Sequence, residues 1–271
     1  MHIEGVTFRA AFCCAALLIL SGGVLKANNL AYANLDGGGF GTIDLTTGAF
    51  TLLGNSGVTL SGMAVYNGVL YGDSLGGTGT LYTINPANGS VTTVGSSGKS
   101  YVDFGDTLTG LFAEGLGDGN LYSIDSATGA ATLVGATNPP YSGGYSSISL
   151  NSSTLYYPQG TGSDFYTLST STGAATLVGS LGGSLEMGAM IFEDGILYAA
   201  EDSPVSSIDT INLATGAATI GPAITGAPSV VFGLSPNPVP TASTVPEPSS
   251  MLLLGSALLG LGGAVKRRLF S

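Results

Sequence analysis

Short runs of alternating apolar and polar residues, separated by glycine-containing turns, fill the chain from about residue 30 to residue 236. The clearest example starts at Leu121 and reads LYSIDSATGAATLVG. Its flanks are rich in β-branched and aromatic residues, which is typical of β-strands, and no helical spacing of apolar residues is present. At its centre, Asp125 is followed four residues later by Gly129. A short polar side chain that accepts backbone hydrogen bonds, then a glycine in the left-handed conformation, predicts a tight hairpin.

This hairpin pattern recurs five times. Its glycine returns at spacings of 41, 40, 44 and 43 residues, as Gly48, Gly89, Gly129, Gly173 and Gly216. Upstream of the hairpin lie two further strand candidates, joined by turns such as Asn67-Gly68 and Asp194-Gly195. Four short strands in each unit of about 40 residues are typical of a β-propeller blade.

The two ends of the repeat region predict a closed ring. The first repeat starts at Leu30 with its second strand, whereas a spare strand candidate appears at residues 229–234. Pairing of this strand with the first blade would leave no open sheet end. We therefore predict an all-β fold, a five-bladed propeller of four-stranded antiparallel blades over residues 28–236. An open β-sandwich or a stacked β-solenoid is the alternative.

The N-terminal segment is typical of a secretory signal peptide. An apolar run from Ala10 to Leu20 follows Arg9, and we expect cleavage after Ala27, which makes residues 1–27 the signal. Cleavage after Ala33 also fits the small-residue rule, but it would remove part of the first strand. Both cysteines, Cys13 and Cys14, lie in this signal, so disulfides are excluded from the mature domain.

Charge is distributed unevenly along the chain. Between residues 28 and 245 there are fifteen acidic residues and one basic residue, Lys99, a net charge of −14. Nucleic-acid binding is therefore excluded, since neutralising phosphates requires lysine and arginine. The single histidine, His2, lies in the signal peptide. Histidine- or cysteine-dependent nucleophilic triads and zinc sites thus lack their residues in the mature chain.

The composition changes after the repeats. Residues 237–245 form a linker rich in proline, serine and threonine, and residues 246–271 combine a proline–glutamate–proline motif, an apolar stretch and a basic cluster. This tail resembles the PEP-CTERM sorting signal of Gram-negative bacteria. The residues that carry the resemblance are Val245, Pro246, Glu247, Pro248, Lys266, Arg267 and Arg268.

The resemblance implies export, recognition by an exosortase-type membrane enzyme, and association with the cell surface or an exopolysaccharide matrix. The uncharged residues 249–265 would span about 25 Å as a helix, so we expect a C-terminal transmembrane helix whose basic cluster stays in the cytoplasm. An ordinary tail anchor is the alternative reading of this segment. The repeat region is also similar to propeller domains that precede such tails, a likeness that implies the fold alone.

Carboxylates are the main chemically active groups that remain. The second strand of each repeat ends in polar residues, and we expect these to recur around one face of the ring as an acidic rim. Calcium binds carboxylate oxygens, which makes Asp73, Glu114, Glu201 and Asp202 candidate calcium ligands, with no other cofactor expected. The alternative is that these are solvated charges which keep an apolar-rich domain soluble.

Aromatic residues suggest a second kind of site. Tyr141 and Tyr145 lie in a connection that does not repeat, and they are candidates for sugar stacking. We therefore predict a non-catalytic module, retained at the surface, that contacts exopolysaccharide or surface proteins. A polysaccharide-acting glycosidase with carboxylates in the central channel is the alternative, although the mature domain has neither tryptophan nor arginine before the tail.

Overall fold

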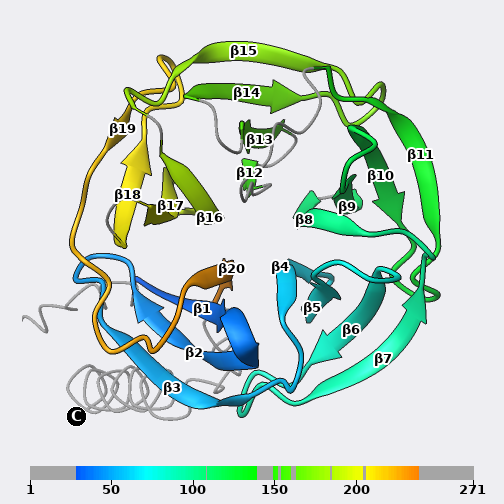
Figure 1. The fold of residues 1–271 in the computed structure, drawn as a ribbon, viewed down its shortest axis with the longest axis horizontal. Helices are drawn as coiled ribbons and strands as arrows, with labels where there is room; N and C mark the ends of the chain where they lie inside the picture. Colours follow the sequence, from blue (N-terminus) through cyan, green and yellow to red (C-terminus); the bar gives the residue numbers. More distant parts are fainter. Residues whose placement is uncertain are drawn as a thin grey trace, which may run out of the picture.

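The computed structural model describes residues 29–107, 109–138, 149–151, 154–159, 163–183, 185–203 and 206–237. These residues form five four-stranded antiparallel sheets arranged in a ring, a five-bladed β-propeller (Figure 1). The first strand of each blade lies nearest the centre and the fourth lies at the circumference. The fold class, the number of blades and the number of strands in each blade are as the sequence predicted.

The strands follow the repeats in order. Blade 1 contains β20 (Val231–Pro236), β1 (Leu30–Leu35), β2 (Gly39–Asp44) and β3 (Phe50–Asn55), with the short 3-10 helix η1 (Asp36–Gly38) between β1 and β2. Blade 2 contains β4 (Leu60–Tyr66), β5 (Val69–Ser74), β6 (Thr80–Ile84) and β7 (Val91–Ser96). Blade 3 contains β8 (Tyr101–Thr107), β9 (Gly110–Gly115), β10 (Asn120–Ile124) and β11 (Ala131–Ala136). Blade 4 contains β12 (Ser149–Asn151), β13 (Thr154–Pro158), β14 (Asp164–Leu168) and β15 (Ala175–Ser180). Blade 5 contains β16 (Glu186–Glu193), β17 (Ile196–Ser203), β18 (Ser207–Ile211) and β19 (Ala218–Thr219).

The ring is closed by its last strand. β20 pairs antiparallel with β1, with Ala33 opposite Leu234, and so completes blade 1 from the C-terminal side (Figure 1). The closing strand predicted from the sequence is confirmed, although it starts two residues later than expected. Ala33 is fully buried inside β1. Signal cleavage after this residue would therefore remove the first residues of β1 from its pairs with β2 and β20.

The repeated glycine serves two purposes. All five copies have φ between 71° and 77°, which only glycine adopts without strain. The copies in blades 3, 4 and 5 also lie against a glycine in the fourth strand of the preceding blade, Gly129 against Gly95, Gly173 against Gly135 and Gly216 against Gly179. A Cβ atom on either partner would meet backbone of the other blade. The sequence predicted the turn conformation, whereas the contact between blades became visible only in the structure.

The hydrophobic core is divided among the blade interfaces. There are five apolar clusters in the described residues, and each joins two neighbouring blades. The cluster between blades 2 and 3, for example, includes Tyr71, Leu81, Tyr101 and Leu111. The repeated tyrosines of the second and third strands contribute to these clusters, with Tyr71, Tyr122, Tyr156 and Tyr198 all buried. The fold is thus stabilised mainly by blade-to-blade burial.

No helix in the described part of the chain is long and apolar enough to cross a membrane. The predicted signal peptide, the tail from residue 246 and its expected transmembrane helix lie outside the described residues.

Candidate functional site

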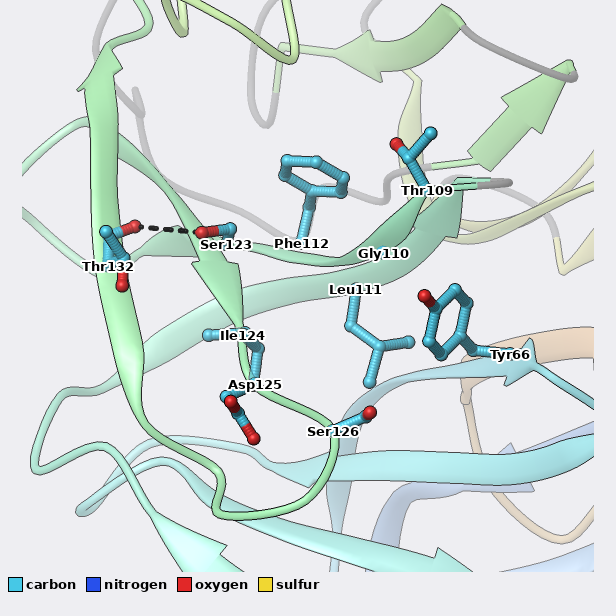
Figure 2. A pocket seen from close by; sticks show the side chains of 10 residues that line it. All are labelled: Tyr66, Thr109, Gly110, Leu111, Phe112, Ser123, Ile124, Asp125, Ser126 and Thr132. Atoms are coloured by element: carbon cyan, nitrogen blue, oxygen red, sulfur yellow. Dashed lines mark hydrogen bonds between the residues drawn. The ribbon is translucent and has the colours of Figure 1, made fainter.

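An open groove lies beside blade 3. It has a volume of about 340 Å³ and is formed by the end of β4, the start of β9, the end of β10 and the turn that follows β10 (Figure 2). This is within the size range of small-molecule sites. Its lining combines an aromatic ring, hydroxyl groups and a carboxylate, from Tyr66, Thr109, Phe112, Ser123, Asp125, Ser126 and Thr132.

The hairpin repeat holds the carboxylate of this groove in place. Asp125 Oδ1 accepts backbone hydrogen bonds from Ala127 N at 2.8 Å and Thr128 N at 2.9 Å. These bonds, the one from Ala127 foremost, lower the pKa of Asp125, so the exposed side chain is ionised at neutral pH. The same bonds orient the carboxylate, which can accept hydrogen bonds from a ligand that occupies the groove.

Tyr66 contributes the aromatic ring from the neighbouring blade. It is the last residue of β4 and comes directly before the Asn67-Gly68 turn, so its half-buried side chain is held at the blade 2 edge. Figure 2 shows the Tyr66 ring beside Leu111, with Ser126 and Asp125 on the turn of blade 3 and Ser123 and Thr132 farther from Tyr66. The lining of the groove thus combines apolar side chains, among them Tyr66, Leu111 and Phe112, with polar groups.

A corresponding groove lies beside blade 5, with a different lining. It is formed by equivalent strand ends and has a volume of about 530 Å³. Asn212 takes the position of Asp125, and its Oδ1 accepts from Ala214 N at 2.9 Å and Thr215 N at 3.2 Å. The remaining lining combines apolar residues such as Ile196 and Leu213 with the hydroxyl groups of Thr210 and Thr219, and it contains no ionised group.

Three of the four predicted calcium ligands are buried. Asp73, Glu114 and Glu201 are at most 1% exposed, and they lie on the second strands of blades 2, 3 and 5. Asp202 is half-buried on β17, next to Glu201 in sequence. No three acidic, histidine or cysteine side chains of the described residues gather where they could hold a metal ion. The expected acidic rim is thus not formed by these residues, because three of the carboxylates point into blade interiors and interfaces.

Glu114 and the residue at the corresponding position of blade 1, Asn34, both make hydrogen bonds at the connections between blades. Glu114 Oε1 lies 3.2 Å from the Thr137 hydroxyl, which is also 3.0 Å from the carbonyl oxygen of Gly119. At the corresponding position of blade 1, Asn34 Oδ1 accepts from Leu60 N of blade 2 at 3.3 Å. These polar groups hold the connection between one blade and the next. At the equivalent position of blade 2, burial raises the pKa of Asp73 well above the usual range.

Sequence reasoning missed several residues with distinctive environments. Tyr66 was assigned to a strand but not to a site, although its place just before an Asn-Gly turn marks it as a strand-end residue. Asp106, near the end of β8, has a pKa raised to about 7 by burial, and no sequence signal distinguishes it from an exposed acid. The predicted sugar-contact residues Tyr141 and Tyr145 lie outside the described residues, as do all residues of the predicted sorting signal.

Comparison with known families bears on the tail. Residues 244–268 match the family described as the PEP-CTERM protein-sorting motif. The chain therefore carries this sorting motif, as the arrangement of Pro246-Glu247-Pro248, apolar stretch and basic cluster predicted. The motif implies export, recognition by an exosortase and membrane-anchored sorting in a Gram-negative bacterium. No curated protein matches the sequence.

Of three similar solved structures, the first supports the fold alone, and the other two have TM-scores too low to support an argument. A Bacteroides thetaiotaomicron protein of unknown function is 17% identical over 71% of this chain and 55% of its own, with a TM-score of 0.53. BamB from Moraxella catarrhalis is 17% identical over 69% of this chain and 56% of its own, with a TM-score of 0.40. The chain thus spans little more than half the length of these two proteins. Glutaminyl cyclase from Myxococcus xanthus is 15% identical, covers 76% and 73% of the two chains and has a TM-score of 0.43. At such identities no function is transferred.

Proposed function

We propose that this protein is an exported, non-catalytic propeller, held at the cell surface or in the extracellular matrix, which binds a hydroxyl-rich polysaccharide through the groove beside blade 3. The single observation that carries the proposal is the lining of this groove, which combines the Tyr66 ring with the ionised Asp125 and several hydroxyl groups. The sorting motif supports the proposed location, because it implies export and recognition by an exosortase.

The chemistry of the lining suits a sugar chain. Sugar rings present apolar C–H faces that stack on aromatic rings, and hydroxyl groups that donate to carboxylates and exchange hydrogen bonds with serine and threonine. Tyr66 supplies the first kind of contact, and Asp125, Ser126 and Thr132 supply the second. A net charge of −14 between residues 28 and 245 opposes an anionic polymer, so we expect the ligand to be neutral or cationic.

Two features support a binding role over a glycosidase. Glycosidases place a pair of carboxyl groups about 5–10 Å apart across an accessible substrate. The groove beside blade 3 contains the single acid Asp125, and the carboxyl pair of blade 5, Glu201 and Asp209, is at most 1% exposed. Neither arrangement provides an accessible acid and base.

The proposal is tested by titrating the full-length protein with neutral polysaccharides of defined composition and following binding by calorimetry. We expect Tyr66→Ala and Asp125→Asn each to weaken binding by about tenfold or more. Asp125→Asn tests the charge most specifically. Asn212, at the equivalent position of blade 5, accepts the same two backbone hydrogen bonds, so we expect the substitution to keep the turn of blade 3 intact.

The matched control is Leu213→Ala, which alters the blade 5 groove and leaves blade 3 unchanged. Its affinity should equal that of the unmodified protein. Equal affinities for all four proteins would contradict the proposed site. If instead the protein bound no polysaccharide and captured a purified surface protein through Tyr66, the ligand class would be wrong and the site correct.

A further inference from the structure

Two buried carboxyl groups in blade 5 lie on either side of one hydroxyl. Glu201 on β17 is 1% exposed, and Ser207 and Asp209 on β18 are 1% and 0% exposed. Ser207 Oγ lies 2.7 Å from Asp209 Oδ1 and 3.2 Å from Glu201 Oε2. Both carboxyl groups therefore lie within hydrogen-bonding distance of the same hydroxyl, that of Ser207.

The count of hydrogen atoms decides how these contacts are made. A serine hydroxyl has one hydrogen to donate. The shorter contact assigns it to Asp209 Oδ1, which also accepts from Gly221 N at 3.1 Å. The contact with Glu201 then needs its own hydrogen, which a protonated Glu201 supplies. Burial, and next the charge of Asp209, raise the pKa of Glu201, which favours the same state.

No basic side chain of the described residues lies beside the two acids to neutralise them. Within the described residues the only basic side chain is Lys99, whose Nζ lies 4.5 Å from the centre of the Tyr122 ring, in the region of blades 2 and 3. The other charged groups on β16 and β17 are acidic, namely Glu186, Glu193 and Asp202, as is Asp36 in η1. None of these four contributes to the pKa shift of Glu201, whereas the charge of Asp209 does.

The pair lies where the chain leaves blade 5 to close the ring. β19 ends at Thr219, and the next residues attach to β18 through Asp209 and Gly221, through Ile208 N to Pro222 O at 2.9 Å, and through a bridge between Ser207 and Ala223. The same segment reaches blade 1, where Phe50 N donates to Thr225 O at 2.9 Å. Ser207 and Asp209 thus anchor the connection between the last blade and the first.

We propose that Glu201, Ser207 and Asp209 form a proton-dependent latch, in which one proton held by the two acids keeps the connecting segment 220–225 attached and the ring closed. Loss of this proton places two negative charges beside a single hydroxyl in a buried site. The repulsion weakens the attachment of Gly221 and its neighbours to β18. Segment 220–225 is therefore attached to β18 more strongly at low pH than at high pH.

The direction of the pH effect follows from linkage. The folded protein retains a proton on Glu201 at a pH where the unfolded chain has released it. Glu201 contributes its full stabilisation at pH values below its pKa in the unfolded chain. This stabilisation is lost as the pH rises through its pKa in the folded protein. Over that window, one extra bound proton raises the unfolding equilibrium constant about tenfold for each pH unit.

The test compares the full-length protein with Glu201→Gln by chemical denaturation at several values from about pH 5 to about pH 9. A glutamine amide donates a hydrogen bond as the protonated acid does, and it cannot lose the proton. We expect the unfolding constant of Glu201→Gln to rise less steeply, by up to about tenfold for each pH unit. Asp209→Asn should flatten the curve less than Glu201→Gln, because it removes the neighbouring charge while burial still raises the pKa of Glu201.

Identical pH curves for all three proteins would overturn the latch. A ¹³C NMR titration of the Glu201 carboxyl in the unmodified protein decides the question should the variants fail to fold, and a pKa at or below the ordinary glutamate value would contradict the proposal. Calcium is added in a parallel denaturation at alkaline pH. Stabilisation of the unmodified protein and not of Glu201→Gln would also overturn the latch, since the pair would then hold a cation.

Discussion

Blades 3 and 5 are built from the same repeat and have a groove at the same place, yet the two grooves differ in chemistry. Both depend on a turn whose first side chain accepts two backbone hydrogen bonds, from Asp125 in blade 3 and Asn212 in blade 5. Both grooves contain hydroxyl groups and apolar side chains, but in blade 3 this residue adds a charge and Tyr66 adds an aromatic ring. The groove of blade 5 has neither. The repeat thus fixes the backbone, and the residues that the backbone does not constrain decide what each groove can bind.

The two blades also differ in how their fourth strands end. β11 in blade 3 has six residues and continues to Gly135, where the backbone of blade 4 is in contact. β19 in blade 5 has two residues, and the connection to blade 1 takes its place, held by Asp209. Where the fourth strand packs directly on the next blade, as in blade 3, a glycine is enough for the contact. In blade 5 the connection to blade 1 replaces most of the fourth strand, and a buried polar group, Asp209, holds it.

The largest effect should come from the glycine contact. A Cβ atom on Gly135 would meet the carbonyl oxygen of Thr172 in blade 4, and neither backbone can move without disturbing its sheet. We expect Gly135→Ala to destabilise the protein by about 2–3 kcal/mol, measured by urea unfolding.

The matched variant in blade 5 is Pro222→Ala, at the same spacing after the repeated glycine. Its cost should stay below about 1 kcal/mol, since it adds no atom and only increases the freedom of the unfolded chain. Equal losses in the two variants would show that blades 3 and 5 do not differ in this contact.

The second effect concerns the buried acid near the groove of blade 3. Burial raises the pKa of Asp106 to about 7, despite an opposing hydrogen bond from the Val65 amide of blade 2. The folded state thus binds a proton more tightly than the unfolded chain, and stability falls as the pH rises from about 4 to about 7.

Asp106→Asn removes this penalty. At about pH 8 it should unfold about 4–8 °C higher than the unmodified protein, equivalent to about 2 kcal/mol, and the difference should shrink towards pH 5. Thermal denaturation at both pH values measures it. A constant difference at the two values would assign the effect to packing and not to the charge.

The smallest effect should come from the turns themselves. Asn212→Ala and Asp125→Ala each remove two backbone hydrogen bonds at an exposed turn, so both should lower the melting temperature by a few degrees. Asp125→Asn should lower it less, because the amide oxygen still accepts both bonds. If Asp125→Ala alone lost stability, the two turns would not be equivalent.

The sequence predicted the architecture closely because propeller repeats express their physics locally. The Asp-to-Gly spacing around Gly129 determines a hairpin, five copies determine five blades, and the unpaired strand near Leu234 determines the closure. The sorting motif was equally readable, since its three parts are contiguous.

The candidate site was not predictable in the same way. Whether Glu114 faces solvent or a blade interface depends on the register between strands and on the packing of the next blade, which no short spacing encodes. Tyr66 and Asp125 lie 59 residues apart in sequence and line one groove only because blades 2 and 3 are neighbours. The sequence therefore predicted that the acids near strand ends form a rim, and it did not predict the groove between blades.

Hydrogen–deuterium exchange of the full-length protein, with and without a saturating polysaccharide, tests most directly whether blade 3 and not blade 5 binds the polysaccharide. We predict slower exchange at residues 66–68, 109–112 and 123–132, with no change at residues 195–197 and 210–214. Protection confined to blade 5, or an exchange pattern that the ligand leaves unchanged in blade 3, would contradict it.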